Sequence, residues 1–272
     1  MYDLIDETAN VLKQRIDGFE PEFGIILGTG LGKLVDEIEI VHSISYSNIP
    51  NFPISTLEFH RGKLIFGHLS GRNVVAMQGR FHYYEGYDMQ QITFPIRVMK
   101  ELGIKKLFVS NASGSLNPEI KKGDLAVITD HIDLFPENPL RGINNERFGS
   151  RFPDMSQPYE FAMIDQAMGI AEKHGFRAHK AVYVGTKGPN LETRAEYRYM
   201  RIIGGDIVGM STVPEIIVAN HAGIPVFAIS VVTDEGFHEN LQPVSLEEII
   251  AVANQSEPKM TLILKELVAL QG

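Results

Sequence analysis

Short apolar runs alternate along the chain with segments in which apolar residues recur at helical spacing. The apolar runs predict buried strands at 23–27, 63–67, 74–76, 106–110, 123–130, 181–184, 206–210 and 226–232. The helical spacing predicts helices at 3–17, 92–102, 161–174, 194–203 and 246–270. We expect Pro258 to break or kink the last of these helices. Such alternation is typical of an α/β fold, and no linker or internal repeat divides the chain, so we expect a single domain spanning residues 1–272.

Three of the predicted strands run into turns of glycine and other small residues, at 28–32, 111–117 and 185–193. In open α/β sheets ligands collect at the carboxyl ends of strands, where backbone N–H groups can face an anion. The sequence GTGLG of the first turn matches neither the dinucleotide fingerprint GxGxxG nor a Walker loop. Two interpretations of the GTGLG turn therefore remain open, an anion site and a turn needed only for packing.

The overall charge narrows the choice of ligand. The 272-residue chain has a formal net charge of −9 and contains no cysteine. We do not expect it to bind nucleic acid or an anionic membrane, because phosphate backbones are bound through clustered Lys and Arg. The lack of cysteine excludes disulfides, thiolate metal sites and a cysteine nucleophile. The chain starts without a basic and apolar leader, and no apolar run approaches the roughly 20 residues that span a bilayer, so we expect a cytoplasmic protein.

The segment 77–87, MQGRFHYYEGY, combines polar groups that suit an oxyanion. In an extended chain Arg80, His82 and Tyr84 would point the same way, since residues two apart in a strand share a face. A guanidinium fork, an imidazole and a phenol, bracketed by glycines, suit a small anion such as phosphate. A surface strand with polar residues on its solvent face explains the same pattern, and both interpretations remain open.

Other candidate residues also have ordinary structural explanations. His60 lies in a loop, where histidine is usually a surface residue. Phe152 lies in a Pro-, Gly- and Asn-rich span that is too long for an ordinary connection, where it can be a local hydrophobic plug. Glu192 precedes a predicted helix, where an acid suits the helix dipole. Ser211 and Thr212 precede a Pro-Glu pair and have the position of a helix cap.

Five motifs occur in a recognisable order: GTGLG, MQGRFHYYEGY, NASGSLN, GPNLET and GMSTVPE. Together they resemble the trimeric purine nucleoside phosphorylases of the purine nucleoside phosphorylase/methylthioadenosine phosphorylase family, from about residue 23 to residue 218. The resemblance implies an α/β fold of one domain, with a twisted mixed central sheet flanked by helices, and a homotrimer with sites near subunit interfaces. It implies that phosphate attacks the anomeric carbon of a purine nucleoside through an oxocarbenium-like sugar. Phosphate is then a co-substrate, and no metal ion or organic cofactor is expected.

The resemblance also implies roles for residues in and between these motifs. The expected phosphate ligands are Thr29, His60, Arg80, His82, Ala112 and Ser211. The expected nucleoside ligands are Tyr84, Phe152, Tyr183, Leu191, Glu192, Met210, Asp234 and Leu246. The aromatic ring at 152 would close over the sugar of the neighbouring subunit. The expected catalytic residues are His82, Glu192 and Asp234, of which the last would assist the leaving purine with a proton or a strong hydrogen bond.

Three positions depart from the family pattern. Asp234 stands where phosphorylases of 6-oxopurine nucleosides usually have Asn, and it can donate a hydrogen bond only if an upward pKa shift keeps it protonated. Leu246 stands in place of a histidine expected at the 5′-hydroxyl, and would tolerate a 5′-methylthio group. Leu191 replaces an aromatic residue, which weakens stacking on the base.

Three functions therefore remain open. Glu192 and the phosphate motifs favour a phosphorylase of inosine- and guanosine-type nucleosides. Asp234 and Leu246 favour a phosphorylase of 6-aminopurine nucleosides or 5′-methylthioadenosine, because an ionised Asp234 can accept from an exocyclic amine. A non-catalytic nucleoside-binding protein on the same scaffold is the third, and the complete set of phosphate positions argues against it.

Overall fold

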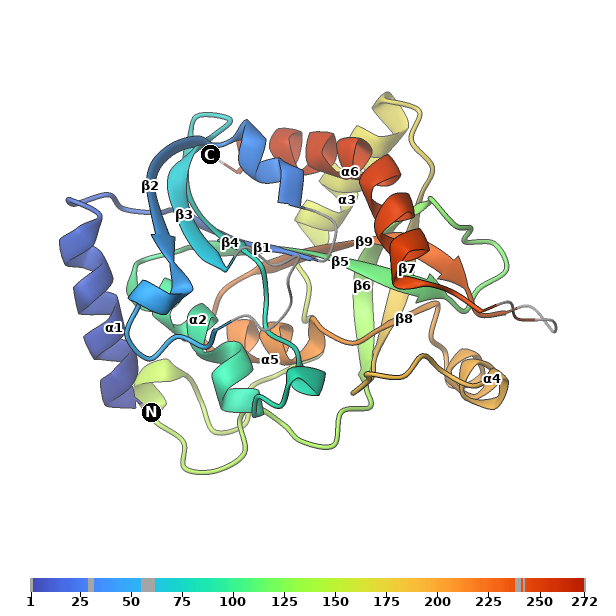
Figure 1. Cartoon of the computed structure of the whole chain (residues 1–272), viewed down its shortest axis with the longest axis horizontal. Coiled ribbons are helices and arrows are strands. Elements are labelled where there is room, and N and C mark those ends of the chain that lie inside the picture. The colour runs from blue at the N-terminus through green and yellow to red at the C-terminus, as the bar shows by residue number, and fades with distance from the viewer. Residues whose placement is uncertain (1, 29–31, 55–61, 238–240, 242, 272) are drawn as a thin grey trace.

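In the part of the chain that the structure describes, a nine-stranded sheet lies at the centre of the molecule (Figure 1). The computed structural model describes residues 2–28, 32–54, 62–237, 241 and 243–271. The strands are β1 (Phe23–Leu27), β2 (Glu39–Ser45), β3 (Lys63–Leu69), β4 (Arg72–Gln78), β5 (Lys106–Ser115), β6 (Leu125–Asp133), β7 (Ala178–Gly185), β8 (Ile207–Gly209) and β9 (Val226–Glu235). Their order is β2-β3-β4-β1-β5-β8-β7-β6-β9, with both parallel and antiparallel neighbours.

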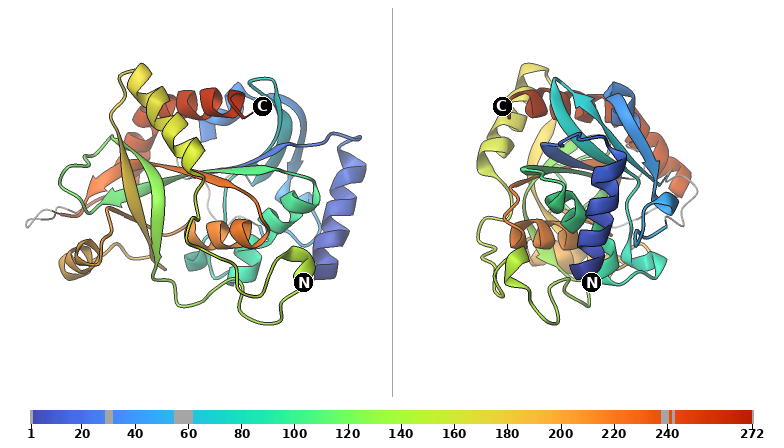
Figure 2. Two further views of the ribbon diagram at one scale, coloured as in Figure 1. Left: turned by 180° about the vertical axis from the view of Figure 1, so that it is seen from behind. Right: turned by 90° about the vertical axis from the view of Figure 1, so that its left-hand side faces the viewer.

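Helices cover both faces of this sheet (Figure 2). They are α1 (Tyr2–Arg15), α2 (Met89–Glu101), α3 (Phe161–Lys173), α4 (Arg194–Ile202), α5 (Val213–His221) and α6 (Leu246–Ala269). Helices α3 and α6 pack together on one side, α1, α2 and α5 pack on the other, and α4 projects at one end (Figure 1). Among the described helices, none has both the length and the apolar character needed to cross a membrane. The predicted α/β fold with a mixed sheet flanked by helices is confirmed.

Strand β5 joins the two halves of the sheet. One of its edges pairs with β9, and the other pairs first with β1 and then, near its end, with β8. Since β9 also pairs with β6, β6 with β7 and β7 with β8, these strands form a closed ring with β5. The ring brings the ends of β5, β8 and β9 together, which is where the cavity described below lies.

The apolar strands are buried where the sequence predicted them. All five residues of β1 are buried, as a strand covered on both faces requires. The predicted strand over 106–110 is too short, because β5 continues through 111–115, which we expected to form a turn. Small polar residues have weak strand propensity, but β9 pairs with all of 111–115 and β8 pairs with 114–115 on the other side. Strand β2 was not predicted, since it is a largely exposed edge strand without an apolar run.

One further segment differs from the predictions, and another agrees with them. The strand before the MQGRFHYYEGY motif ends at Gln78, and Tyr83–Glu85 form a 3-10 helix, so the prediction of an extended chain through Tyr84 is wrong. Helix α6 continues through Pro258 without a break and changes direction about midway (Figure 1). Ser245 caps this helix, because its side chain accepts a hydrogen bond from the backbone N–H of Glu248.

Candidate active site

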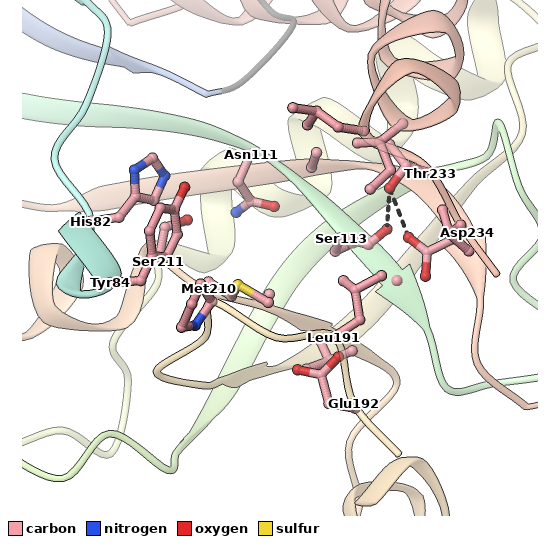
Figure 3. A pocket seen from close by; sticks show the side chains of 18 of the residues that line it. His82, Tyr84, Asn111, Ser113, Leu191, Glu192, Met210, Ser211, Thr233 and Asp234 are labelled. Atoms are coloured by element: carbon pink, nitrogen blue, oxygen red, sulfur yellow. Dashed lines mark hydrogen bonds between the residues drawn. The ribbon is translucent and has the colours of Figure 1, made fainter. Parts of the chain in front are cut away.

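A cavity of about 440 Å³ lies where β5, β8 and β9 end (Figure 3). Its lining residues come from 80–84, 111–114, 189–192, 208–211, 233–234 and 244–249. His82, Tyr84 and Ser211 lie toward one end of the view, Glu192 and Asp234 lie toward the other, and Met210 lies between them (Figure 3). The cavity thus brings together residues from four of the five motifs.

Arg80 provides the positive charge at the first end and is 1% exposed. Its Nε lies 3.2 Å from Glu215 Oε1, and its Nη2 lies 2.5 Å from Glu215 Oε2. Its Nη1 donates to the carbonyl oxygen of Ser110 at 2.9 Å and to Ser211 Oγ at 3.2 Å. A bidentate pair fixes the plane of the guanidinium group, so the cation is held beside the Ser211 hydroxyl.

His82 is fixed by its neighbours in sequence. Its ring stacks on Tyr84 with 4.7 Å between ring centroids. Glu85 Oε1 lies 2.9 Å from both the backbone nitrogen and the ring Nδ1 of His82. Burial lowers the pKa of His82, although Glu85 opposes the shift. A neutral ring that donates from Nδ1 to Glu85 has an acceptor at Nε2, which suits a protonated oxygen of phosphate.

A strained turn positions Ser211. Thr212 has φ 70° and ψ −57°, and the N–H of Val213 donates to the carbonyl oxygen of Ser211 at 2.8 Å, which defines a γ-turn with positive φ. Thr212 Oγ1 accepts from Asn111 Nδ2 at 2.9 Å, and Tyr183 Oη accepts from the Ser211 N–H at 3.4 Å. The predicted capping role of Thr212 is wrong, because its side chain makes no cap hydrogen bond. These contacts hold Ser211 at the cavity wall.

Two carboxyl groups lie at the other end. The Thr186 hydroxyl donates to Glu192 Oε1 at 3.0 Å, and Thr233 Oγ1 lies 2.9 Å from Asp234 Oδ1. Burial raises the pKa of both carboxyls, and the charge of Asp234 adds to the rise at Glu192. Burial of both groups in one cavity therefore favours the neutral form of each carboxyl more than water does.

Asp234 reaches its position because Gly114 has no side chain. The two residues are partners in the register between β5 and β9. A Cβ atom on Gly114 would lie only 2.7 Å from Asp234 Oδ2. Strand β5 therefore forms a flat wall that passes from the phosphate ligand expected at Ala112 to the carboxyl of Asp234.

Apolar side chains complete the wall of the cavity. Leu191 and Leu246 both line the cavity and are 43% and 51% exposed. Val244 and Ile249 add to the same apolar surface. A flat ring bound between the carboxyls would thus contact aliphatic groups.

Four residues expected in the site lie elsewhere or outside the described part of the chain. Tyr183 is fully buried behind Ser211 and does not line the cavity. Phe152 is 87% exposed in the connection between β6 and α3, and it does not line the cavity either. Thr29 and His60 lie outside the described residues.

Three site residues were not identified from the sequence. The motif containing Glu215 predicts only the start of a helix, although an acid in the otherwise apolar run VPEIIVA is a signal of a buried partner. Asn111 was expected only to offer backbone groups, yet its buried Oδ1 has no hydrogen-bond partner in the described structure. Glu85 follows His82 by three residues, the spacing at which side chains meet in one helical turn.

The polar groups of the cavity suit an organic substrate together with an anion. Among the described residues, no group of three or more His, Asp or Glu side chains is placed to hold a metal ion. The site offers a cation and a hydroxyl at one end, and hydrogen-bonding carboxyls beside an apolar wall at the other. A molecule with an anionic part and a flat polar ring matches this distribution.

Comparisons with known proteins give the class of protein that the five sequence motifs resemble. The family model described as "Phosphorylase superfamily" matches residues 22–269. Purine nucleoside phosphorylase 1 of Bacillus subtilis (strain 168) is 47% identical over 269 residues, which are 99% of this chain and 99% of the relative. Isoform 2 of purine nucleoside phosphorylase from Schistosoma mansoni, solved with cytosine and ribose-1-phosphate, has a TM-score of 0.95 at 40% identity and covers 100% of this chain and 97% of its own. A Schistosoma purine nucleoside phosphorylase solved with hypoxanthine has a TM-score of 0.93 at 43% identity, with 98% and 97% covered.

The chain therefore belongs to the phosphorylase superfamily and, within it, to the purine nucleoside phosphorylases. Members of this group are pentosyltransferases, which transfer a pentosyl group from a purine to phosphate. The reaction class expected from the five motifs is confirmed.

Proposed function

We propose that this phosphorylase prefers 6-oxopurine nucleosides of the inosine and guanosine type. The observation that carries the proposal is the pair of carboxyls, Glu192 and Asp234, at one end of the cavity, with a raised pKa at each. A pair that holds one proton offers one acceptor and one donor. A 6-oxopurine presents the complementary groups, a donor at N1–H and acceptors at O6 and N7.

Binding of the purine is proposed to place the proton on Asp234, since only a protonated Asp234 can donate to N7 or O6. Glu192 then accepts from N1–H in its ionised form, and Asp234 donates to N7 or O6. As the bond between N9 and the sugar breaks, negative charge grows on the imidazole ring of the purine, and transfer of the Asp234 proton to N7 neutralises it. Asp234 thereby replaces the amide donor that is usual at this position.

Phosphate is placed at the opposite end, where Arg80, His82, Ala112 and Ser211 line the cavity, with Thr29 and His60 as further ligands. One phosphate oxygen attacks the anomeric carbon on the face away from the purine and forms the new C–O bond. Its negative charge stabilises the oxocarbenium-like sugar, and fixed donors hold it in line. Tyr84 and Met210 contact the sugar between the two ends. Phosphate is a co-substrate, and no metal ion or organic cofactor takes part.

The working form is proposed to be a homotrimer. Phe152 is 87% exposed and Ile143 is 91% exposed in the same long connection. Large apolar side chains that do not pack in the core of their own subunit suit contact with another subunit. Phe152 of one subunit then closes over the sugar bound by its neighbour.

Side-by-side assays of phosphate-dependent base release from inosine, guanosine, adenosine and 5′-methylthioadenosine test the proposed preference. We expect the highest kcat/KM with inosine and guanosine. Turnover of adenosine with no turnover of inosine would contradict it. No phosphate-dependent release from any nucleoside would contradict the reaction itself.

A second candidate is a preference for 5′-methylthioadenosine. Leu246, Val244 and Ile249 form an apolar part of the cavity wall, which suits a methylthio group. In the same assay this candidate predicts that 5′-methylthioadenosine exceeds adenosine as a substrate, whereas a preference set by the carboxyl pair alone makes the two equal.

A further inference from the structure

The GTGLG turn is anchored by its first residue to the strand that holds Arg80. The N–H of Gly28 donates to Ser110 Oγ at 3.2 Å. A Cβ atom on Gly28 would lie only 2.8 Å from the carbonyl oxygen of Ser110. That same oxygen accepts a hydrogen bond from Arg80 Nη1 at 2.9 Å. The turn therefore starts beside the end of the cavity at which phosphate is proposed to bind.

The chain that leaves the turn is anchored by a buried acid of α6. The turn leads into a short 3-10 helix, Gly32–Glu37. Because the first N–H groups of a helix have no partner within it, that of Lys33 needs an acceptor from elsewhere. Glu257 Oε1 accepts from this N–H at 2.5 Å, and Glu257 is 0% exposed. Helix α6 thus holds the end of the turn through a residue 224 positions away in sequence.

The carboxyl group of Glu257 is poorly suited to its surroundings. Its Oε2 is buried and has no hydrogen-bond partner in the described structure. A carboxyl taken out of water with one oxygen unpaired costs free energy, and burial raises the pKa of Glu257. An apolar side chain of similar size would fill the same space without this cost. The carboxyl therefore contributes the hydrogen bond to Lys33 and not the stability of the core.

We propose that Glu257 is a positioning residue for phosphate binding, because its carboxyl fixes the chain that leaves the GTGLG turn. The inference rests on the proposed function, in which this turn supplies the phosphate ligand Thr29. Glu257 does not line the main cavity but lines a separate one of about 380 Å³, so it acts without touching the substrate. A turn held at both ends has less freedom to lose when phosphate binds, which favours binding.

Two neighbouring groups provide matched controls. Thr261 lies four residues after Glu257 in α6, and its buried Oγ1 also has no partner in the described part of the chain. Lys265 pairs with Glu37 at the other end of the 3-10 helix, with side chains 33% and 44% exposed. Thr261→Val and Lys265→Ala alter the contact between the same two helices but leave the hydrogen bond to Lys33 in place. Neither variant should change the KM for phosphate.

The test compares Glu257→Met with the wild type in both directions of the reaction. We expect the KM for phosphate to rise about tenfold, as the loss of one hydrogen bond implies. In the reverse direction the KM for ribose 1-phosphate should rise similarly. The KM values for inosine and hypoxanthine should not change. The midpoint of chemical denaturation should stay the same or increase, because a buried carboxyl is removed.

Two conservative variants separate the hydrogen bond from the charge. Glu257→Gln keeps an oxygen acceptor at the same reach, so its KM for phosphate should stay close to that of the wild type. Glu257→Asp keeps the acid but is shorter by one methylene group, so it should raise the KM for phosphate as Glu257→Met does. An equal rise in Glu257→Gln and Glu257→Met would show that the hydrogen bond has no such role and would overturn the inference.

Two other results would also contradict this role. One is an unchanged KM for phosphate in both Glu257→Met and Glu257→Asp. The other is a parallel rise of the KM values for phosphate and inosine together with a loss of stability, which would indicate a purely structural residue. Both leave the proposed function standing. Absence of nucleoside turnover by the wild type would contradict the proposed function itself, and calorimetric binding of inorganic phosphate to the wild type and Glu257→Met then still tests the inference.

Discussion

The Arg80 guanidinium and the Glu215 carboxylate form a bidentate ion pair in which only 1% and 3% of the side chains are exposed. Its two ends come from the loop after β4 and from α5, so it ties together segments that are far apart in sequence. The pair also sets the plane in which Arg80 faces Ser211.

Glu215→Gln should destabilise the protein by roughly 3 kcal/mol, because it leaves the buried charge of Arg80 without its partner. Chemical denaturation measures this directly. Asp165→Asn is the control, since it breaks a pair with Lys180 whose side chains are 71% and 52% exposed, and it should cost less than about 1 kcal/mol. The double variant Arg80→Met, Glu215→Leu should recover most of the stability but not the binding of phosphate. A similar loss of unfolding free energy in Glu215→Gln and Asp165→Asn would show that the buried pair stabilises the protein no more than an exposed pair does.

Asp234→Asn should raise the preference for 6-oxopurines and extend their turnover to higher pH. Burial raises the pKa of Asp234, and turnover of inosine needs its protonated form. The contribution of Asp234 to wild-type activity is therefore full below this folded-state pKa and is lost as the pH rises through it. An amide has no proton to lose, so the alkaline limb of the kcat/KM profile due to Asp234 should disappear. An alkaline limb and a substrate ratio that both match the wild type would place Asp234 outside the reacting site.

Gly209→Ala should disturb the wall that carries Met210 and Ser211. The new Cβ would lie 2.3 Å from Tyr183 Oη and 3.0 Å from its Cζ. Tyr183 is fully buried, so we expect a loss of about 1–3 kcal/mol in stability and a rise in the KM for phosphate.

Tyr183→Phe in the Gly209→Ala background removes the atom in closest conflict and should restore part of the stability. Gly169→Ala is the matched control, because a Cβ at this position in α3 meets nothing within 4 Å. It should be neutral or stabilising by up to about 1 kcal/mol. Thermal unfolding of these three variants and of the wild type measures the order of their stabilities.

Phe152→Ala should raise the KM for nucleoside roughly tenfold, a loss of about 1.4 kcal/mol in binding, although Phe152 lies outside the cavity of its own chain. Co-expression with Glu192→Gln provides the decisive measurement. In mixed oligomers some sites combine an intact Glu192 with an intact Phe152 from the neighbour, so activity should exceed that of either variant alone. Activity no higher than the average of the two parents would contradict a shared site.

Much of the fold followed from the apolar pattern, because covered strands such as β1 need an unbroken apolar run. The edge strand β2 has no apolar run that predicts it, since its stability comes from pairing with β3 and not from burial. The prediction of a turn at residues 111–115 is wrong because strand pairing overrides local preference there. Their intrinsic preference is for turns, and only the strands on both sides hold them extended.

The site was predictable at the level of residue type but not of geometry. Arg80, His82 and Tyr84 line one cavity, yet they do so through a turn and a 3-10 helix and not through strand alternation. Thr212 looked like a cap because position and composition fit, whereas its positive φ depends on contacts with Asn111 that no local pattern contains. Glu215 acquires its role only when α5 meets the loop after β4, a contact across 135 residues.

Because β5 is continuous, it sets the distance between the two ends of the substrate cavity. Ser110 holds Arg80 through its carbonyl oxygen, and Gly114 abuts Asp234. These two points are four residues apart on one strand, and at about 3.3 Å per residue they are separated by about 13 Å. Backbone covalent geometry, which no side-chain substitution alters, thus fixes the distance between the anion-binding end of the cavity at Arg80 and the base-binding end at Asp234. A molecule with the right groups at the wrong separation can engage one end of the cavity but not both.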